Sequence, residues 1–221
     1  MKALCRIALL AVAPIVLGCG PGKSGTPAEV VGPGEREERG ELGREPSSGP
    51  AAAPREQVEN PQYTSWAAFP KGTTVILRSE TRADGHPAVT TTTKTYTLLT
   101  LTDAEAVIEM RARTQRYDGV EINNPPEKLT VPKRIALPPG VSKAEFEKPA
   151  GGDEQGEETV TVGGKEYKAR FSRSRGRNEA GEVLGQVWSS DAVPGGLVKS
   201  VTRTPGVGKT TTIELVEVKT P

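Results

Sequence analysis

Few residues in this chain could act as metal ligands or nucleophiles. Its 221 residues include two cysteines, Cys5 and Cys19, and one histidine, His86. This scarcity excludes zinc sites built from Cys and His, disulfide frameworks and haem attachment motifs. His86 lies in a turn sequence, and the chain contains no Gly-x-Ser-x-Gly motif that would supply a nucleophilic serine. We therefore expect an exposed histidine, and no catalytic triad, metal site or cofactor.

The segment Gly206-Val207-Gly208-Lys209-Thr210 partly matches a phosphate-binding loop. That motif requires a glycine five residues before Gly208, where this chain has Arg203, and a helix after the lysine. The residues that follow Lys209 are instead mostly β-branched, which favours a strand. We expect a hairpin loop here and no phosphate site.

Two acidic pairs could supply the two carboxylates that a glycosidase needs, namely Glu145 with Glu147 and Glu157 with Glu158. Both pairs lie in or next to expected loops, and their spacing indicates no particular reaction. The sequence therefore assembles no catalytic set, and we expect a protein that is not an enzyme.

A run of basic residues is the most marked surface feature. Lys168, Arg170, Arg173 and Arg175 surround Phe171. They could form a face that binds an anion such as a lipid headgroup, an acidic polysaccharide or nucleic acid. Alternatively they are a solvated face, because mixed charges keep exposed strands soluble and glutamates flank the run. The formal net charge of the whole chain is only +1, so we expect no nucleic-acid partner.

The N-terminus has the pattern of an export signal. Lys2 and Arg6 are followed by an apolar run of eleven residues from Ile7 to Leu17. A helix that spans a bilayer needs about 20 apolar residues, so this run is too short for a membrane span. We predict that residues 1–18 are a cleaved signal peptide, and Cys5 would leave with it.

The run ends in Val16-Leu17-Gly18-Cys19, which resembles the lipobox of bacterial lipoproteins. In that family the cysteine thiol receives a diacylglycerol, the signal is cut before it, and the new amino terminus is acylated. The resemblance implies that Cys19 carries a covalent lipid, with palmitate among its acyl chains, and that this lipid anchors the protein to a membrane of the cell envelope. Gly20 replaces the Asp that retains some lipoproteins at the inner membrane, which favours the outer membrane, at its periplasmic face or the cell surface.

Residues 19–60 are expected to be a lipidated cysteine followed by a disordered tether. Gly and Pro recur there, charges of both signs alternate in the Glu35–Glu45 region, and no aromatic residue occurs. A segment with so little apolar surface to bury cannot offset the entropy of ordering.

The remaining residues, 61–221, are predicted to form one domain that is mainly β. All nine aromatic residues lie between Tyr63 and Trp188. Alternation with period two recurs, as where Ala106, Ile108, Met110 and Ala112 alternate with polar or larger residues. Pairs of turn residues separate such runs. The pattern predicts an antiparallel meander, folded as a strongly curved sheet or half-barrel with little helix.

Two segments of this domain need separate interpretation. Residues 103–114 begin with a helix-like capping box, but their apolar residues share one side only when they form a strand, and we predict a strand. Residues from about 122 to 157 contain six prolines and a Gly-rich end. We predict a long Pro-rich loop there, with an edge strand within 128–137.

Two segments that contain tryptophan carry a second resemblance. One runs from Trp66 through Phe69 to Val75, and the other runs from Trp188 through a Val-Pro-Gly-Gly turn to Lys199. A strand ending in Trp, such a turn and a return strand are similar to exported bacterial proteins of unknown function with a half-barrel or lipoprotein-carrier-like sheet. The resemblance covers residues 61–219 and implies a fold, with no catalytic residues.

These observations predict a non-enzymatic, membrane-anchored lipoprotein that binds or scaffolds an envelope protein or lipid. The alternative is a carrier or chaperone that holds an acyl chain or apolar peptide in the concavity of the sheet. A carrier requires an apolar pocket of ~300 Å³ or more, lined by Trp66, Phe69 and Trp188. A solid interior with these aromatic residues in the core would favour the first interpretation.

Overall fold

The computed structural model describes residues 56–147 and 152–221. The predicted signal peptide, Cys19 and the tether up to residue 55 lie outside the described residues, so the predictions about them stay predictions. The described elements, in chain order, are β1 (Gln57–Glu59), α1 (Pro61–Ala67), β2 (Thr74–Ala83), β3 (Val89–Leu101), β4 (Glu105–Gln115), β5 (Glu121–Asn123), β6 (Glu127–Pro132), β7 (Arg134–Ala136), α2 (Lys143–Phe146), β8 (Glu154–Val162), β9 (Lys165–Asn178), β10 (Gly181–Ser189), β11 (Leu197–Thr204), the 3-10 turn η1 (Pro205–Val207) and β12 (Lys209–Lys219).

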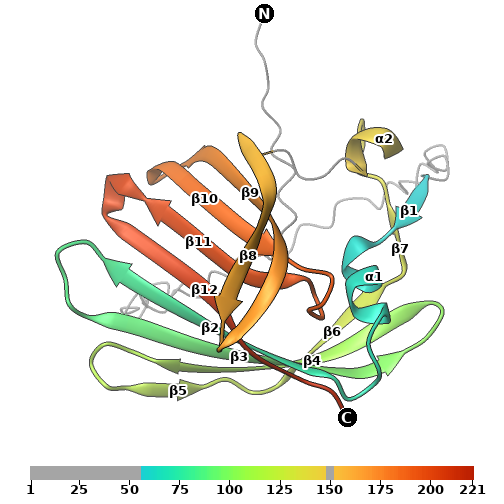
Figure 1. Cartoon of the computed structure of the whole chain (residues 1–221), viewed down its shortest axis with the longest axis horizontal. Helices are drawn as coiled ribbons and strands as arrows, with labels where there is room; N and C mark the ends of the chain where they lie inside the picture. Colours follow the sequence, from blue (N-terminus) through green and yellow to red (C-terminus); the bar gives the residue numbers. More distant parts are fainter. Residues whose placement is uncertain (1–55, 148–151) are drawn as a thin grey trace, which may run out of the picture. The chain divides into compact units, whose positions relative to one another are not determined.

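Ten of the strands form one antiparallel sheet (Figure 1). Its order is β5-β4-β3-β2-β12-β11-β10-β9-β8, and β6 also pairs with the outer side of β4. The sheet consists of two meanders, β2 to β4 and β8 to β12, which are joined because the last strand, β12, pairs with β2. The prediction of a mainly β, antiparallel, curved sheet with little helix is confirmed. No helix of the described ranges has the length and apolarity to cross a membrane.

The segment at 103–114 is a strand, as predicted. Ala106, Ile108, Met110 and Ala112 are all at most 8% exposed, and the residues between them lie on the opposite face of β4. The helix-like capping residues have another role, because the Thr102 hydroxyl accepts hydrogen bonds from backbone amides of the turn between β3 and β4, including that of Glu105 at 3.1 Å. A capping pattern therefore occurs here without a helix.

The region 122–157 contains more regular structure than the long loop we predicted. It includes β6, which pairs with β4 along residues 105–110, as well as β7 and the short helix α2. Leu129 and Val131 of β6 point toward the core, and Pro132 ends the strand at the edge of the sheet, where a missing backbone N–H costs no ladder hydrogen bond. The prolines mark the ends of short edge strands rather than an unstructured loop.

Helix α1 was not expected, and it begins at a clear N-terminal cap. The Asn60 side chain accepts a hydrogen bond from the backbone amide of Gln62 at 3.0 Å, and Pro61 occupies the first turn, where its missing N–H is tolerated. Ordered structure also precedes the expected domain start at 61, because β1 pairs with β7. The helix buries Tyr63 and Trp66, which lie one turn apart.

The core forms where α1 and the turn between β10 and β11 pack on the sheet. Trp66 is 4% exposed and lies against Gly195 of that turn, whose backbone amide donates to the Ser65 carbonyl at 3.3 Å. The core residues, all less than 9% exposed, are Tyr63, Trp66, Val75, Leu98, Ala106, Ile108, Val131, Val162, Val193, Val198 and Leu215.

The β8–β9 hairpin extends beyond the end of β10 and reaches β12. Strand β9 pairs with β10 only from residue 170 onward, and residues 165–169 pair only with β8. At the hairpin tip, the backbone of Gly163 lies against the carbonyl of Val216, the residue at a β-bulge of β12. Gly163 has a φ of 57° and no room for a side chain. This contact holds the β8–β9 hairpin against β12, which is three positions from β9 and four from β8 in the sheet order.

Candidate functional site

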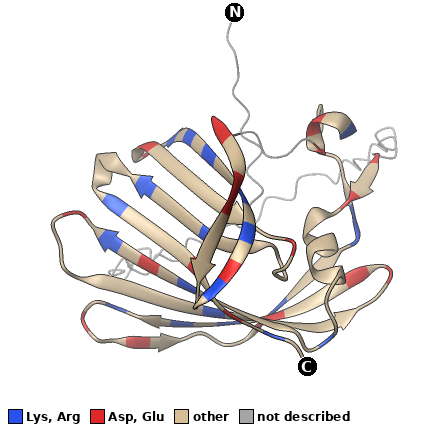
Figure 2. Ribbon diagram, viewed as in Figure 1, with Lys and Arg blue, Asp and Glu red and all other residues tan. Residues whose placement is uncertain are grey.

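The strand register divides the side chains of the sheet between two faces, because neighbours that are opposite in register point to the same side. One row that crosses the sheet from β4 to β9 is Arg113, Thr93, Arg78, Glu214, Lys199, Trp188 and Phe171. We call the side that carries this row the charged face. Lys, Arg, Asp and Glu recur along these strands (Figure 2).

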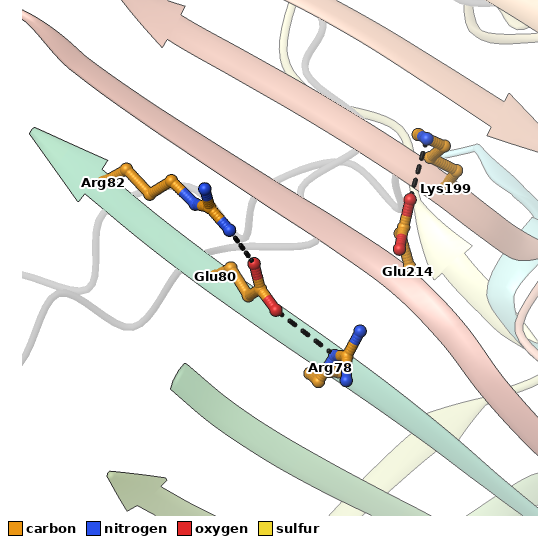
Figure 3. Close-up of polar contacts among 5 residues, drawn as sticks. All are labelled: Arg78, Glu80, Arg82, Lys199 and Glu214. Carbon is orange, nitrogen blue, oxygen red and sulfur yellow. Dashed lines mark hydrogen bonds and ion pairs between the residues drawn. The ribbon is translucent and has the colours of Figure 1, made fainter. Parts of the chain in front are cut away.

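The charges of this face neutralise one another in pairs (Figure 3). On β2, Glu80 accepts from Arg82 at 3.0 Å and lies 3.6 Å from Arg78. Between β11 and β12, Lys199 contacts Glu214 at 2.7 Å. Surface pairs of this kind stabilise the fold by at most about 1 kcal/mol each. Their consequence is a face with a well-solvated, mixed and nearly balanced charge.

At the edge of this face the same pairing fixes a carboxylate. Arg113 donates to Glu121 of β5, and Asn123 donates to the other oxygen of that carboxylate at 3.0 Å. These hydrogen bonds from Arg113 and Asn123 lower the pKa of Glu121 below its ordinary value of 4.5.

On β2, β3, β4, β10, β11 and β12 the opposite side is almost free of charge, and we call it the uncharged face; on β9 this side carries Lys168 and Arg170. On β2, β3, β4, β10, β11 and β12 its positions beyond the core are Leu77, Ser79, Thr81, Thr90, Thr92, Lys94, Ala112, Thr114, Val183, Gly185, Val187, Ser200, Thr202, Thr204, Thr211 and Ile213, with Ala83 and Lys209 at the far end. Two of its exposed aliphatic side chains are Ile122 on β5 and Val187 on β10, at 43% and 41% exposure.

Hydroxyl groups on the uncharged face bond to one another. The Thr92 and Thr114 hydroxyls are 3.0 Å apart, and the Thr81 and Thr211 hydroxyls are 3.1 Å apart. A hydroxyl that is paired across two strands has less hydrogen-bonding capacity left for water. The face is therefore less polar than its threonine content suggests.

Lys94 is a charged residue on this face, as is Lys209 at its far end. Lys94 lies on β3 opposite Leu77 of β2 and Ala112 of β4, and no ion pair joins it to any described residue. Tyr96 is two residues along β3 on the same side, and burial raises the pKa of its phenol above the ordinary 10.0. One acidic residue lies on the same side of the sheet: Glu127 of β6, which is in register with Met110 of β4.

The three aromatic residues that we assigned to a pocket or core do not lie together. Trp66 is in the core under α1. Trp188 is half-buried on the charged face, where its Nε1 donates to Glu158 and the Lys199 ammonium lies 5.8 Å from its ring centre. Phe69 is half-buried in the turn after α1. Trp66 and Trp188 lie on different sides of the sheet, so the three residues do not line one apolar pocket.

The four basic residues that we assigned to an anion-binding face divide between the two sides of β9. Arg173 and Arg175 are on the charged face with Phe171, and Lys168 and Arg170 point to the other side. Three of them have acidic partners: Arg170 contacts Asp191 at 2.7 Å, Arg173 contacts Glu154 at 2.6 Å, and Arg175 contacts Glu182 at 3.1 Å. Anion binding by this run stays a prediction, and an anion would have to compete with three carboxylates.

A hollow of about 540 Å³ lies beside the end of β10, and most of its side chains are polar or charged. Glu157, Glu158 and Asp191 all line it. Glu158 accepts from Trp188 and Asp191 is paired with Arg170, which leaves Glu157 as the carboxylate of this hollow without a partner among the described residues.

His86 and the glycine-rich segment lie in a turn and a hairpin loop, as the sequence predicted. His86 is exposed in the turn between β2 and β3. The glycine-rich segment is a hairpin connection in which η1 is followed by Gly208 with a φ of 56° and by β12, so no helix follows it. In the described ranges no three His, Cys, Asp or Glu side chains come together in a way that could hold a metal ion.

Sequence reasoning missed Lys94, although one signal was available. The segment Val89–Leu101 contains a single charged residue, and a lone charge in a long, β-branched strand is unusual. What the sequence did not contain was the register that places Lys94 on the uncharged side of five neighbouring strands.

Comparison with known proteins gives likenesses of fold only. No protein-family model and no curated protein matches the chain. Among solved structures, it is similar to a Bacteroides fragilis protein described as exported with a YmcC-like fold, at 11% identity and a TM-score of 0.40, covering 68% of this chain and 97% of the other. It is also similar to a protein of Parabacteroides distasonis described as a lipoprotein, at 12% identity and a TM-score of 0.40, with the same coverage. A third is a Vibrio parahaemolyticus domain described as an outer membrane lipoprotein-sorting protein, at 8% identity and a TM-score of 0.22, covering 71% and 89%. Exported proteins and lipoproteins, the class of the sequence resemblance, are thus among these structures, and what they do is not carried over to this chain.

Proposed function

We propose that this protein is a lipid-anchored component of the bacterial cell envelope that binds a partner or ligand through the uncharged face of its sheet, without catalysis. The observation that carries the proposal is the segregation of charge. Strands β2, β3, β4, β11 and β12 place paired charges on one side and mostly hydroxyl or aliphatic groups on the other, where the charged residues are Lys94 on β3 and Lys209 at the far end of β12.

The physical argument concerns which side of the sheet suits water. An antiparallel sheet commonly has one solvated face and one face that packs against another layer. The charged face, with its ion pairs, has the composition of a solvated surface. The main packing contacts of α1 with the sheet are to β4 and β6, at one end of the uncharged face. The part of this face on β10, β11 and β12 is therefore the surface that we assign to a partner.

The anchor part of the proposal is supported by the lipobox at Cys19. Several acyl chains, each contributing about 0.8 kcal/mol per buried CH₂, would hold the protein firmly on a membrane. We propose the outer membrane as its location because Gly20 follows the cysteine. Cys19→Ser should abolish the incorporation of labelled palmitate and leave a larger precursor, and normal labelling in this variant would contradict the anchor.

The arrangement of the aromatic residues supports binding on the open face of the sheet rather than a carrier with a pocket lined by Trp66, Phe69 and Trp188. Such a carrier would enclose its cargo between Trp66, Phe69 and Trp188, whereas Trp66 is part of the core and Trp188 is bonded to Glu158 on the charged face. A ligand on the uncharged face would instead lie on an open sheet surface.

The binding face can be tested in intact cells with a photo-crosslinking residue at one of two positions on β10. Val187 is exposed on the uncharged face, and Glu182 is exposed on the charged face of the same strand. We expect discrete adducts from position 187 and none, or the same diffuse background as without light, from position 182. Equal adducts from both positions, or none from position 187, would contradict the proposal.

A further inference from the structure

Lys94 is an ammonium group that forms no ion pair with any described residue, and its neighbours in register are uncharged. Its neighbours in register are Leu77 and Ala112, of which Ala112 is 8% exposed, and Lys94 itself is only partly exposed. A charge in such surroundings loses part of its hydration without an opposite charge to compensate. An anion that arrives at this point would supply that compensation.

Many other cations of the sheet already have carboxylate partners, as Lys199 has in Glu214 and Arg173 has in Glu154. On β9, Arg170 is likewise paired with Asp191. An anion at any of these positions would have to displace a carboxylate, whereas at Lys94 it would not. Lys168, Lys209 and Arg177 have no ion pair with a described residue, but they are exposed and fully hydrated, whereas Lys94 is partly buried.

The surface beside Lys94 suits an apolar chain. From β3 it continues over β2, β12 and β11 to β10, which is four strand spacings or about 19 Å. Leu77, Ile213 and Val187 lie on this surface, and the Thr81 and Thr211 hydroxyls bond to each other. Strands β2, β12, β11 and β10 carry one charged side chain on this face, that of Lys209, which lies at the far end of the face.

We propose that the uncharged face binds a long-chain fatty acid, with its carboxylate at Lys94 and its hydrocarbon chain across β2, β12 and β11 toward Val187. This inference rests on the proposed function of the face and names its ligand. The carboxylate matches the partly buried Lys94, which has no ion pair with a described residue, and the hydrocarbon chain matches the uncharged strip beside it.

The test compares a fatty acid with its uncharged ester. The probes are a palmitic acid that carries a fluorescent anthroyloxy group and the methyl ester of the same compound, titrated into the full chain with Cys19→Ser to remove the acyl acceptor. We expect the acid to bind about tenfold more tightly than the ester, as for one charge-assisted hydrogen bond. Lys94→Gln should remove this preference and leave ester binding unchanged. Its melting temperature should match the parent, because Lys94 forms no ion pair with a described residue.

Lys168→Gln is the matched control. Lys168 is an exposed lysine on β9 for which no ion pair is found among the described residues, and its substitution should leave the preference for the acid intact. The inference is overturned if acid and ester bind equally to the parent chain, if neither binds, or if Lys168→Gln rather than Lys94→Gln removes the preference. The proposed function fails on a different result, namely the loss of the difference between crosslinks from positions 187 and 182.

Discussion

Replacement of Trp188 by alanine distinguishes a residue of the sheet surface from a residue of the core. Trp188 is half-buried between Lys199 and Phe171 in the row that crosses the charged face, and its Nε1 donates to the Glu158 carboxylate. The ring packs against the core cluster, and the Lys199 ammonium lies 5.8 Å from its centre.

The magnitude follows from this partial burial. Removing a fully buried Trp costs about 3–5 kcal/mol, so a half-buried ring should cost about 2 kcal/mol. The hydrogen bond to Glu158 adds little, because that carboxylate remains accessible to water in the variant. For a domain of this size, 1 kcal/mol lowers the melting temperature by about 2–4 °C, which gives about 4–8 °C for Trp188→Ala.

The assay is thermal and denaturant unfolding of Trp188→Ala beside Trp66→Ala. Trp66 is 4% exposed in the core under α1, so its loss should cost the full range of about 3–5 kcal/mol. Trp188→Phe keeps most of the packing and should lose about 1 kcal/mol or less. An equal loss in the two alanine variants, or an unchanged melting temperature in Trp188→Ala, would refute the placement of Trp188 at a half-buried site of the charged face.

Three further predictions concern the cap of α1, the tip of the β8–β9 hairpin and a buried phenol. Asn60→Ala should lower the free energy of unfolding by about 1 kcal/mol through loss of the helix cap, and no change in denaturant midpoint would contradict that role. Gly163→Ala should destabilise the protein more than Gly164→Ala, measured in the same way, because both glycines have positive φ but only Gly163 meets a backbone carbonyl, that of Val216. Tyr96 should ionise above pH 10.0, because burial raises its pKa; the stability it contributes is complete below pH 10.0 and is lost as pH rises through the raised value. The measurement is a pH titration followed by the absorbance of tyrosine phenolate. Tyr96→Phe should remove the component that ionises at the highest pH, and a titration curve unchanged by this substitution would contradict the prediction.

Much of the sheet could be predicted because its strands carry local signals. Ala106, Ile108, Met110 and Ala112 have the period of a half-buried strand, and the structure buries all four. Turn residues gave the hairpins, as at Asp84-Gly85 and Gly163-Gly164. These features depend on neighbours in the chain, and so they can be inferred from short segments.

Helix α1 was missed and the short strands after β4 were only partly recognised, for two different reasons. The helix has only seven residues, too few to show a clear period of 3.6, although Asn60-Pro61 is a recognisable start signal. Strand β6 was only partly recognised, within a predicted loop, because prolines surround it, and it forms through pairing with β4 rather than through its own propensity.

The candidate site could not be predicted because it depends on register. Whether Lys94 shares a side with Arg78 or with Leu77 is decided by the pairing of β2 with β3, and a shift of one residue would reverse it. The pairing of β12 with β2, which are more than 120 residues apart in the chain, joins the two halves of both faces. Neither is visible in local composition.

The most direct test of the central claim measures which face of the sheet is covered in the envelope. Residues 56–147 and 152–221 contain no cysteine. A cysteine introduced at position 187 therefore reports on the uncharged face of β10, and a cysteine at position 182 reports on its charged face. Both variants are labelled with a maleimide, first as purified protein and then in intact envelopes. We predict that Val187→Cys reacts at least about tenfold more slowly in envelopes than when purified, because a partner or ligand covers the uncharged face, and that Glu182→Cys reacts equally in both. Equal reactivity of Val187→Cys in the two states would contradict the assignment of the uncharged face as the binding surface.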